Sequence, residues 1–254
     1  ARVVLAAGGQ AGPQFGTDGS AFALARMLGH SVAEPYPCLV PLRCAGFPVG
    51  LKGVRANCAL SLYLDGRCAG TERGEVQFAE YGLSGIPAMQ LSCLLGPGVK
   101  KAGTSVDFFP EMAFPVLRGM LEQRCASGMF ASLETLLLGL VAKKLGHAIL
   151  KSCGLQPLAR APGSLSRRAV NALASALKNW RFAVEGTLPW TQAQVTGGGV
   201  PLAEVKTEGC ASLRCPGLYL SGEVLDAAGD CGGFNLQWAW ATGIAAGRAA
   251  ARGL

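Results

Sequence analysis

The sequence is poor in charged residues and in histidine. Charged residues make up 15% of its 254 positions, and His30 and His147 are its two histidines. Ten cysteines are present, but no two of them form a Cys-x-x-Cys pair. Zinc sites are built from closely spaced cysteine and histidine ligands, so a zinc site is poorly supported and no metal is expected. No run of eighteen apolar residues occurs either, so no membrane-spanning helix is expected.

The cysteines mostly lie within apolar segments, which is typical of reduced thiols packed as small hydrophobic residues in a cytoplasmic protein. No basic and apolar leader stands at the start of the chain, which agrees with that localisation. Cys231 is the exception, because it lies in a glycine-rich loop before a predicted helix. A helix N-terminus at that point would lower the pKa of its thiol. The alternative is that Cys231 is simply a tolerated small residue.

Apolar residues and glycine are abundant instead. Half of the residues are hydrophobic and 36 are glycine, which allows a sizeable core and many tight turns, as in cofactor-binding α/β proteins. The net charge is +7, but the basic residues are scattered, and pairs such as Lys100-Lys101 and Arg167-Arg168 lie outside any aromatic-rich groove motif. Nucleic acid is therefore not the expected partner. A mildly basic face also suits anionic cofactors such as FAD or NADPH.

The most informative stretch lies near the C-terminus. Residues 218–220 are predicted to form a short buried strand, which Gly222 ends. An acidic, glycine-rich loop follows, and a helix of small residues is predicted from Gly232 or Gly233 to Ala251. A strand, a glycine-rich turn and a helix N-terminus together favour an anion site, because the first N–H groups of the helix and its dipole point into the loop.

Two runs in this stretch carry a family resemblance. Gly-Glu-Val-Leu-Asp at 222–226 and Gly-Gly-Phe-Asn-Leu-Gln-Trp-Ala at 232–239 closely resemble the C-terminal flavin motif of the BaiN/RdsA-like flavoproteins, the aminoacetone-oxidase-like FAD enzymes. The resemblance implies that Asp226 lies near the ribityl-phosphate part of FAD. It also implies that the helix start offers backbone N–H groups to the pyrimidine side of the flavin ring. The cofactor-binding residues expected here are Gly222, Glu223, Asp226, Gly232, Gly233, Phe234, Asn235, Leu236 and Gln237.

The N-terminal segment carries a second part of the resemblance. Residues 2–6 form an apolar, β-branched run that is typical of a buried parallel strand, and a helix is expected from Ser20 to Leu28 with Gly29 as its cap. Residues 5–9 and the loop at 16–19 are similar to the second flavin-contacting strand of the family and its glycine-rich loop. This similarity adds Ala7, Gly8 and Gly9 to the expected cofactor-binding residues.

The middle of the chain has a different sequence pattern, which is typical of antiparallel strands. Residues 54–64 alternate between apolar and polar, which predicts a strand, and Asp65-Gly66 predicts a hairpin turn. Segments at 67–69 and 75–79 are expected to pair with the strand at 54–64. Further strands are expected at 105–109 and 180–186, with short helices between them. Residues 193–200 then return to the family pattern. There, Thr196 to Gly199 either form a strand and turn that re-enter the flavin domain, or back onto the flavin ring.

We therefore predict an α/β protein in which a partial Rossmann-like FAD-binding domain carries an inserted domain. The FAD-binding domain is discontinuous, comprises residues 1–44 and 187–254, and lacks its N-terminal part. The inserted α+β domain comprises residues 45–186 and consists of an antiparallel β unit and short helices.

Members of the family begin with a strand and a Gly-x-Gly-x-x-(Gly/Ala) turn that binds the FAD pyrophosphate, and nothing similar precedes Ala1. The spacing Ala7-x-Gly9-x-x-Gly12 imitates that turn, but Pro13 and Gly16 interrupt it where a helix should open. The expectation is a chain that binds FAD weakly or not at all on its own. A missing N-terminal segment or a second copy of the chain are the macromolecular partners considered.

The resemblance implies a flavoprotein oxidoreductase that uses FAD and acts on a small-molecule substrate, with NAD(P)H as co-substrate or with electrons from the substrate itself. No catalytic acid or base is assigned, although His30, Tyr81, Glu223 and Asp226 lie near family motifs. Two alternatives remain. One is a non-catalytic fragment that serves as a protein-interaction or structural module through an exposed sheet edge. The other is a basic RNA-binding protein.

Overall fold

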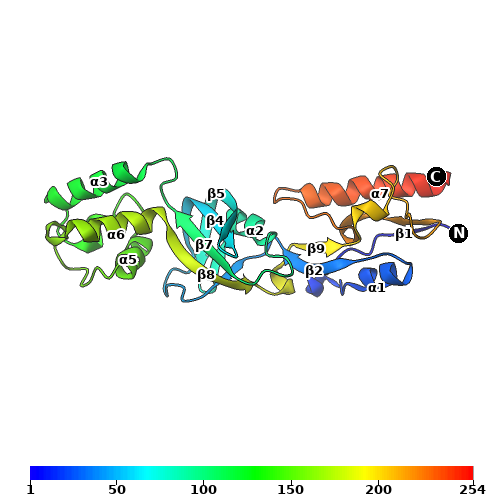
Figure 1. Cartoon of the computed structure of the whole chain (residues 1–254), viewed down its shortest axis with the longest axis horizontal. Helices are drawn as coiled ribbons and strands as arrows, with labels where there is room; N and C mark the ends of the chain where they lie inside the picture. The colour runs from blue at the N-terminus through cyan, green and yellow to red at the C-terminus, as the bar shows by residue number, and fades with distance from the viewer. Residues whose placement is uncertain (254) are drawn as a thin grey trace. The chain divides into compact units, whose positions relative to one another are not determined.

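The structure is a computed structural model that describes residues 1–253, and the chain divides into two compact units (Figure 1). Unit 1 contains Ala1–Pro41, Ser92–Val99 and Thr187–Leu254, and unit 2 contains Leu42–Leu91 and Lys100–Gly186. Residues 92–99 group with unit 1, whereas the inserted domain predicted from the sequence, 45–186, includes them. None of the helices within residues 1–253 combines the length and apolarity needed to cross a membrane.

Unit 1 is built around a short parallel strand pair. Strand β1 (Val3–Leu5) pairs with β10 (Leu218–Leu220), and the C-terminal helix α7 (Phe234–Arg252) packs against both strands (Figure 1). Helix α1 (Ser20–Met27), which ends one residue earlier than predicted, contributes to the core beneath them. The buried side chains of this core include Leu5, Phe22, Ala25, Val200, Leu220 and Leu225.

The prediction that residues 2–6 form a buried strand is only partly right. The strand is parallel, but Val3 is 58% and Val4 37% exposed, and Leu5 is the residue of β1 that reaches the core. Within the described residues β1 has a strand on one edge only. Its first two residues are therefore exposed, although their β-branched character predicts burial.

A second pair of strands, β2 (Ala33–Cys38) and β9 (Val195–Gly199), is antiparallel. Strand β2 was not predicted, because Pro35 and Pro37 remove two N–H donors from it and prolines are rare inside strands. The register shifts between Ala33 and Tyr36. Short 3-10 turns connect the elements of unit 1. They are η1 (Pro13–Phe15), η3 (Trp190–Gln192), η4 (Leu202–Glu204) and η5 (Gly222–Val224).

Unit 2 contains a closed antiparallel barrel with the strand order β3-β6-β5-β4-β7-β8. These strands are β3 (Leu42–Cys44), β4 (Val54–Leu64), β5 (Arg67–Ala79), β6 (Gly82–Ser84), β7 (Ala102–Asp107) and β8 (Trp180–Thr187). The hairpin at Asp65-Gly66 is confirmed. However, the two pieces predicted at 67–69 and 75–79 are one continuous strand. Thr71 and Glu72 between them pair with Ser61 and Leu60 on β4, so their polarity marks an exposed face rather than a loop.

Helices accompany the barrel within unit 2. Helix α6 (Arg167–Lys178) begins after Ser166, whose side chain accepts a hydrogen bond from the Ala169 N–H at 3.2 Å and so caps the first turn. Aromatic rings fill part of the barrel interior, where the ring centroids of Trp180 and Phe182 lie 4.8 Å apart. The helices are α2 (Ile86–Ser92), α3 (Phe114–Ala126), α4 (Leu133–Leu136), α5 (Lys143–Ser152) and α6 (Arg167–Lys178), with the turn η2 (Pro162–Ser164).

Candidate functional site

Thr196 in β9 joins three segments of unit 1 that are far apart in the sequence. Its Oγ1 accepts hydrogen bonds from the backbone N–H groups of Gln10 and Ala11, at 2.8 and 3.0 Å. Its own N–H donates to Glu223 Oε1 at 3.0 Å, and its hydroxyl is also hydrogen-bonded to the Glu223 side chain. Thr196 is fully buried. The loop after β1 and the loop after β10 are therefore both fixed to β9.

Gly9 is the point where the loop after β1 approaches this network most closely. A Cβ at Gly9 would overlap both the Glu223 carboxylate and the Thr196 side chain, so no larger residue fits there. Gly8 has a left-handed φ of 77° with open space where a Cβ would stand. Ala7 is exposed. Gly9 thus has a packing role, while Ala7 and Gly8 leave the backbone of the loop accessible.

Glu223 is half-buried beside Thr196, and its environment perturbs its ionisation. Burial raises the pKa of the Glu223 carboxyl above its usual value, because it disfavours the charged form. The hydrogen bonds from Thr196 act in the opposite direction but do not prevail. Glu223 therefore holds its proton to a higher pH than an exposed glutamate does.

The loop that starts at Gly222 is anchored to helix α7. The Gly222 N–H donates to Thr242 Oγ1 at 2.9 Å, and Trp238 Nε1 donates to the Gly222 carbonyl at 3.2 Å. The Thr242 hydroxyl donates in turn to the Trp238 carbonyl at 2.7 Å. These three bonds set the distance between the loop and the helix. Gly222 also has a φ of 75°, which favours glycine at this position.

Asp226 lies at the exposed end of the same loop. Its backbone N–H donates to the Val200 carbonyl at 2.8 Å, which continues the pairing between the loop after β10 and the residue after β9. Its carboxylate makes no hydrogen bond or ion pair with any residue in the described range 1–253. The side chain is therefore held at its base and available to a ligand at its tip.

Asn235 holds the glycine-rich loop before α7. Its Oδ1 accepts from the Gly229 N–H and its Nδ2 donates to the Gly229 carbonyl, both at 2.8 Å. The side chain of Asn235 is thus committed to the loop. The backbone N–H of Gln237 is committed as well, because it donates to the Gly233 carbonyl at 2.9 Å. The expected set of ligand-facing N–H groups at 232–237 is therefore too broad, since Gln237 closes the first bond within the helix.

The first turn of α7 presents backbone N–H groups at an open surface. The helix begins at Phe234, after Gly232 and Gly233 with φ of 124° and 93°. The first N–H groups of a helix have no acceptor within it, and no side chain caps those of Phe234, Asn235 and Leu236. Phe234 is 62% and Leu236 63% exposed. Donors and the positive end of the helix dipole are therefore accessible to an acceptor or anion.

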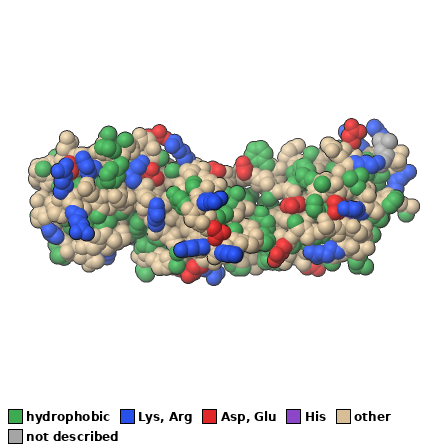
Figure 2. Space-filling model, viewed as in Figure 1, with side chains coloured by type: hydrophobic (Ala, Val, Ile, Leu, Met, Phe, Trp, Pro, Cys, Tyr) green, Lys and Arg blue, Asp and Glu red, His purple; other side chains and the backbone are tan. Residues whose placement is uncertain are grey.

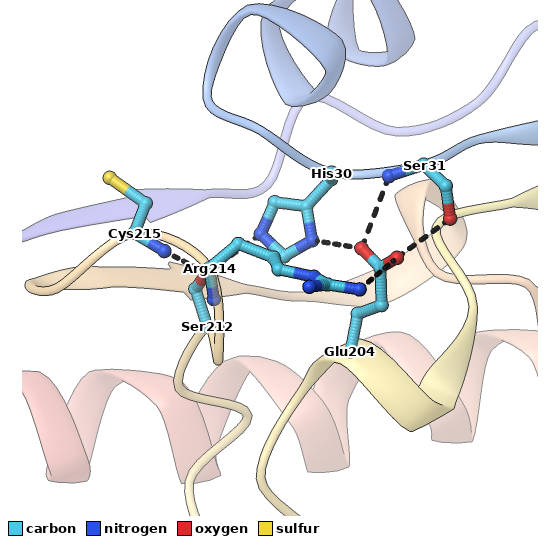
Figure 3. A network of polar contacts seen from close by, with 6 residues as sticks. All are labelled: His30, Ser31, Glu204, Ser212, Arg214 and Cys215. Carbon is cyan, nitrogen blue, oxygen red and sulfur yellow. Dashed lines mark hydrogen bonds and ion pairs between the residues drawn. The ribbon is translucent and has the colours of Figure 1, made fainter.

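His30 belongs to a polar network that connects the end of α1 to the 204–215 segment (Figure 3). His30 Nδ1 lies 2.8 Å from Glu204 Oε2, and Nε2 lies 2.7 Å from Ser212 Oγ. Glu204 also accepts from the Ser31 N–H and hydroxyl at 3.1 and 2.7 Å, and from Arg214 at 3.3 Å. The hydrogen bonds from Ser31 are the main cause that lowers the pKa of Glu204 to about 2.

The order Ser212–His30–Glu204 has the connectivity of a hydrolytic triad but not its accessibility. Ser212 Oγ accepts hydrogen bonds from the N–H groups of Arg214 and Cys215 at 3.0 and 2.8 Å, so its lone pairs are occupied by the backbone (Figure 3). The side chain of His30 is fully buried. A nucleophile needs an accessible lone pair and a substrate site beside it. This network therefore fixes the 204–215 segment to α1.

Two further sequence candidates lie elsewhere. Tyr81 is in unit 2, in the turn between β5 and β6, where its carbonyl accepts from the Cys44 N–H at 2.8 Å. His147 is also in unit 2, with Nε2 at 3.2 Å from the Glu134 carbonyl oxygen. Both therefore belong to a different unit from Thr196 and Glu223.

Cys231 differs from its expectation. The pKa of its thiol is raised rather than lowered, because burial disfavours the charged thiolate. Nearby Cys93 and Asp230 act in the same direction. Among residues 1–253, no three histidine, cysteine or acidic side chains gather into a group that could hold a metal ion.

An apolar cavity of about 310 Å³ lies between α7 and the 202–210 segment. Leu202, Val205, Leu225, Trp238 and Ala245 line it. It shares Trp238 with the anchor of the Gly222 loop but includes no residue of the first turn of α7. The cavity is therefore separate from the first turn of α7.

The glycine-rich loops and the start of α7 can be compared with known proteins. The family model described as the HI0933-like protein Rossmann domain matches residues 1–249. The chain belongs to this family. Membership confirms the family resemblance of the C-terminal motif, and a Rossmann domain agrees with the α/β character of unit 1.

Three relatives from this family are similar over nearly the whole chain. A 3-dehydro-bile acid delta(4,6)-reductase of Clostridium scindens is 38% identical over 255 residues, which cover 98% of this chain and 62% of the relative. Ribosomal RNA dihydrouridine synthases of Haemophilus influenzae and Escherichia coli are 28% and 29% identical, over 96% and 95% of this chain. The chain spans 58% of the length of each synthase. It thus matches about three fifths of these curated relatives.

The sequence indicated the glycine-rich segments of this site but not the side chains that hold them together. Thr196 was considered only as part of a strand or wall, and Thr242 and Trp238 were not singled out. Their roles depend on hydrogen bonds to backbone groups far away in the sequence. The one available signal is a polar residue at the start of a buried Gly-Gly-Gly strand, since buried hydroxyls need partners.

Proposed function

We propose that unit 1 forms part of the flavin site of an FAD-dependent oxidoreductase. The observation that carries this proposal is the Thr196 network. It holds the loop after β1, strand β9 and the loop after β10 together, and the turn η5 at the start of this last loop contacts α7. A large, flat, anionic cofactor needs backbone donors, glycine for close approach, and fixed loops. This arrangement supplies all three.

The residues present fit such a cofactor. The N–H groups of Phe234, Asn235 and Leu236 would donate to the carbonyl oxygens on the pyrimidine side of the ring, and Asp226 would accept from ribityl hydroxyls. Asn235 would act through the loop that its side chain holds. When bound, the flavin supplies hydride chemistry. The described residues supply orientation, and the chain's own acid or base is not assigned.

The reaction we propose is the reduction of a carbon–carbon double bond, with NAD(P)H as the source of electrons. The names of the relatives support this class, since a delta(4,6)-reductase and a dihydrouridine synthase both add hydrogen across a ring double bond. A small organic molecule is the substrate we favour, because the relative with 38% identity is named for a bile acid.

An RNA substrate is the second candidate, and two relatives named for ribosomal RNA favour it. The net charge of +7 is compatible with an RNA substrate, although Lys and Arg are spread over the face drawn in Figure 2 without one dominant cluster. Binding to an RNA should weaken steeply as salt increases, because counterions are released from phosphates. A flat salt response would dismiss this candidate.

The flavin proposal is tested by equilibrium titration with FAD, followed through the visible absorbance of the flavin. Asp226→Ala should weaken binding because it removes the acceptor for the ribityl group. Asp230→Ala is the matched control, since Asp230 is an exposed acid in the same loop and has no proposed contact. Equal affinities of the two variants would contradict the role of Asp226.

A further inference from the structure

Two cysteines of unit 1 that are 55 positions apart in the sequence lie in contact. Cys38 is the last residue of β2, and Cys93 follows α2 in the short segment that groups with unit 1. Their thiols are hydrogen-bonded to each other. Two thiols that are hydrogen-bonded to each other can form a disulfide once their sulfur atoms move together.

The backbone around the pair stabilises a negative sulfur at Cys93. The Leu39 N–H donates to Cys93 Sγ at 3.4 Å. Leu39 has a φ of 46°, a left-handed conformation that is rare for a bulky residue and costs energy. Leu39 is also buried, so the fold maintains this conformation. The hydrogen bonds from Cys38 and Leu39 lower the pKa of the Cys93 thiol.

The two thiols differ in accessibility. Cys38 is 0% exposed, and its pKa is raised by the hydrogen bond to Cys93 and by burial, whereas Cys93 is half-buried. Gly197 on the neighbouring strand makes room for Cys38, because a Cβ there would lie 2.6 Å from its sulfur. The pair therefore consists of a half-buried Cys93 and a fully buried Cys38 whose raised pKa keeps its thiol protonated.

We propose that Cys93 and Cys38 form a two-electron redox pair that reacts with hydroperoxides, with Cys93 as the attacking thiol and Cys38 as the resolving thiol. The inference goes beyond the flavin site, because the reaction needs no flavin. The Cys93 thiolate attacks the distal peroxide oxygen, the O–O bond breaks, and a sulfenic acid and hydroxide form. Cys38 sulfur then attacks Cys93 sulfur, the S–O bond breaks, and water leaves with the Cys38 proton. In sum, two thiols and hydrogen peroxide give one disulfide and two waters.

The proposal is tested on the purified reduced chain with one equivalent of hydrogen peroxide, alkylation and tryptic mass spectrometry. Cys38 and Cys93 are the single cysteines of the tryptic peptides 27–43 and 74–100. The expected product joins these two peptides with the loss of two hydrogens. A disulfide from Cys93 to the peptide that contains Cys231, which lies nearby, would overturn the pairing.

Variants test the order of the steps. In Cys38→Ser, peroxide should leave Cys93 as a sulfenic acid that dimedone traps, because the resolving thiol is gone while a hydroxyl remains as hydrogen-bond donor to Cys93. Exposed Cys68 is the internal control in the wild-type chain. Cys93 should react at least about tenfold faster than Cys68, since a lowered thiol pKa increases the thiolate fraction. Equal rates, or no dimedone adduct in Cys38→Ser, would overturn the proposal.

Discussion

Replacing Thr196 by valine should loosen the loop after β1 without changing the shape of the side chain. Valine has nearly the volume of threonine but no hydroxyl. The change therefore leaves the N–H groups of Gln10 and Ala11 without their acceptor and removes one donor from Glu223. An unsatisfied buried donor costs about 1–3 kcal/mol. Because both N–H groups are partly buried, water offsets some of this cost, and we expect a loss of ~3 kcal/mol.

The measurement is amide hydrogen exchange of Gln10 and Ala11, because exchange at these two amides reports the local loss of stability directly. A loss of ~3 kcal/mol corresponds to roughly a hundredfold faster exchange at these amides. Thr196→Ser is the matched control. It keeps the hydroxyl and loses a methyl group worth about 1 kcal/mol. Exchange that is unchanged in Thr196→Val, or equally fast in Thr196→Ser, would refute the reasoning.

Three further substitutions follow from the same network and its neighbours. The pKa of Glu223 is raised in the folded state. Its contribution to stability is therefore present below its unfolded pKa and is lost as pH rises through the folded pKa. In Glu223→Gln, the urea midpoint should fall less steeply as pH rises. The pKa of Glu204 is lowered to about 2 in the folded state, so its contribution to stability is present above its unfolded pKa and is lost as pH falls through about 2. Glu204→Gln should be less stable at neutral pH and should lose this dependence of stability on acid pH. An unchanged acid unfolding transition would contradict the prediction. Gly9→Ala should destabilise unit 1 by about 1–3 kcal/mol through overlap with its neighbours. Its control, Gly247→Ala on α7, meets open space and should stabilise by about 0.5–1 kcal/mol, both read from thermal unfolding.

Local patterns predicted much of the fold because they report local physics. The Asp65-Gly66 hairpin and the Ser166 cap were predictable, since turn and cap residues act within four positions. Strand β2 was not, because Pro35 and Pro37 contradict strand propensity and only pairing with β9 overrides it. The polar stretch inside β5 was mistaken for a loop because one face of the barrel is exposed.

In the candidate site, too, residues that act locally could be predicted and contacts between distant segments could not. The glycines and Asp226 could be predicted from a motif, because each glycine acts through its own backbone and Asp226 acts through its own carboxylate. Thr196 and the contact between Cys38 and Cys93 could not, because each depends on chain segments brought together by folding. The hydrogen bonds of Thr196 join residues separated by 185 and 186 positions. No periodicity in the sequence encodes such a contact.

The central claim is that the first turn of α7 binds the flavin ring through backbone N–H groups. Its most direct test is FAD titration of Phe234→Pro against Phe234→Ala, followed by visible absorbance. Both variants remove the exposed ring, but proline also removes one N–H at the first helical position, where proline is tolerated. The account predicts weak, saturable binding that Phe234→Ala retains and Phe234→Pro reduces by about tenfold, as for one lost charge-assisted or polar hydrogen bond. Equal binding by both variants, or no perturbation of the flavin spectrum at any concentration, would contradict it.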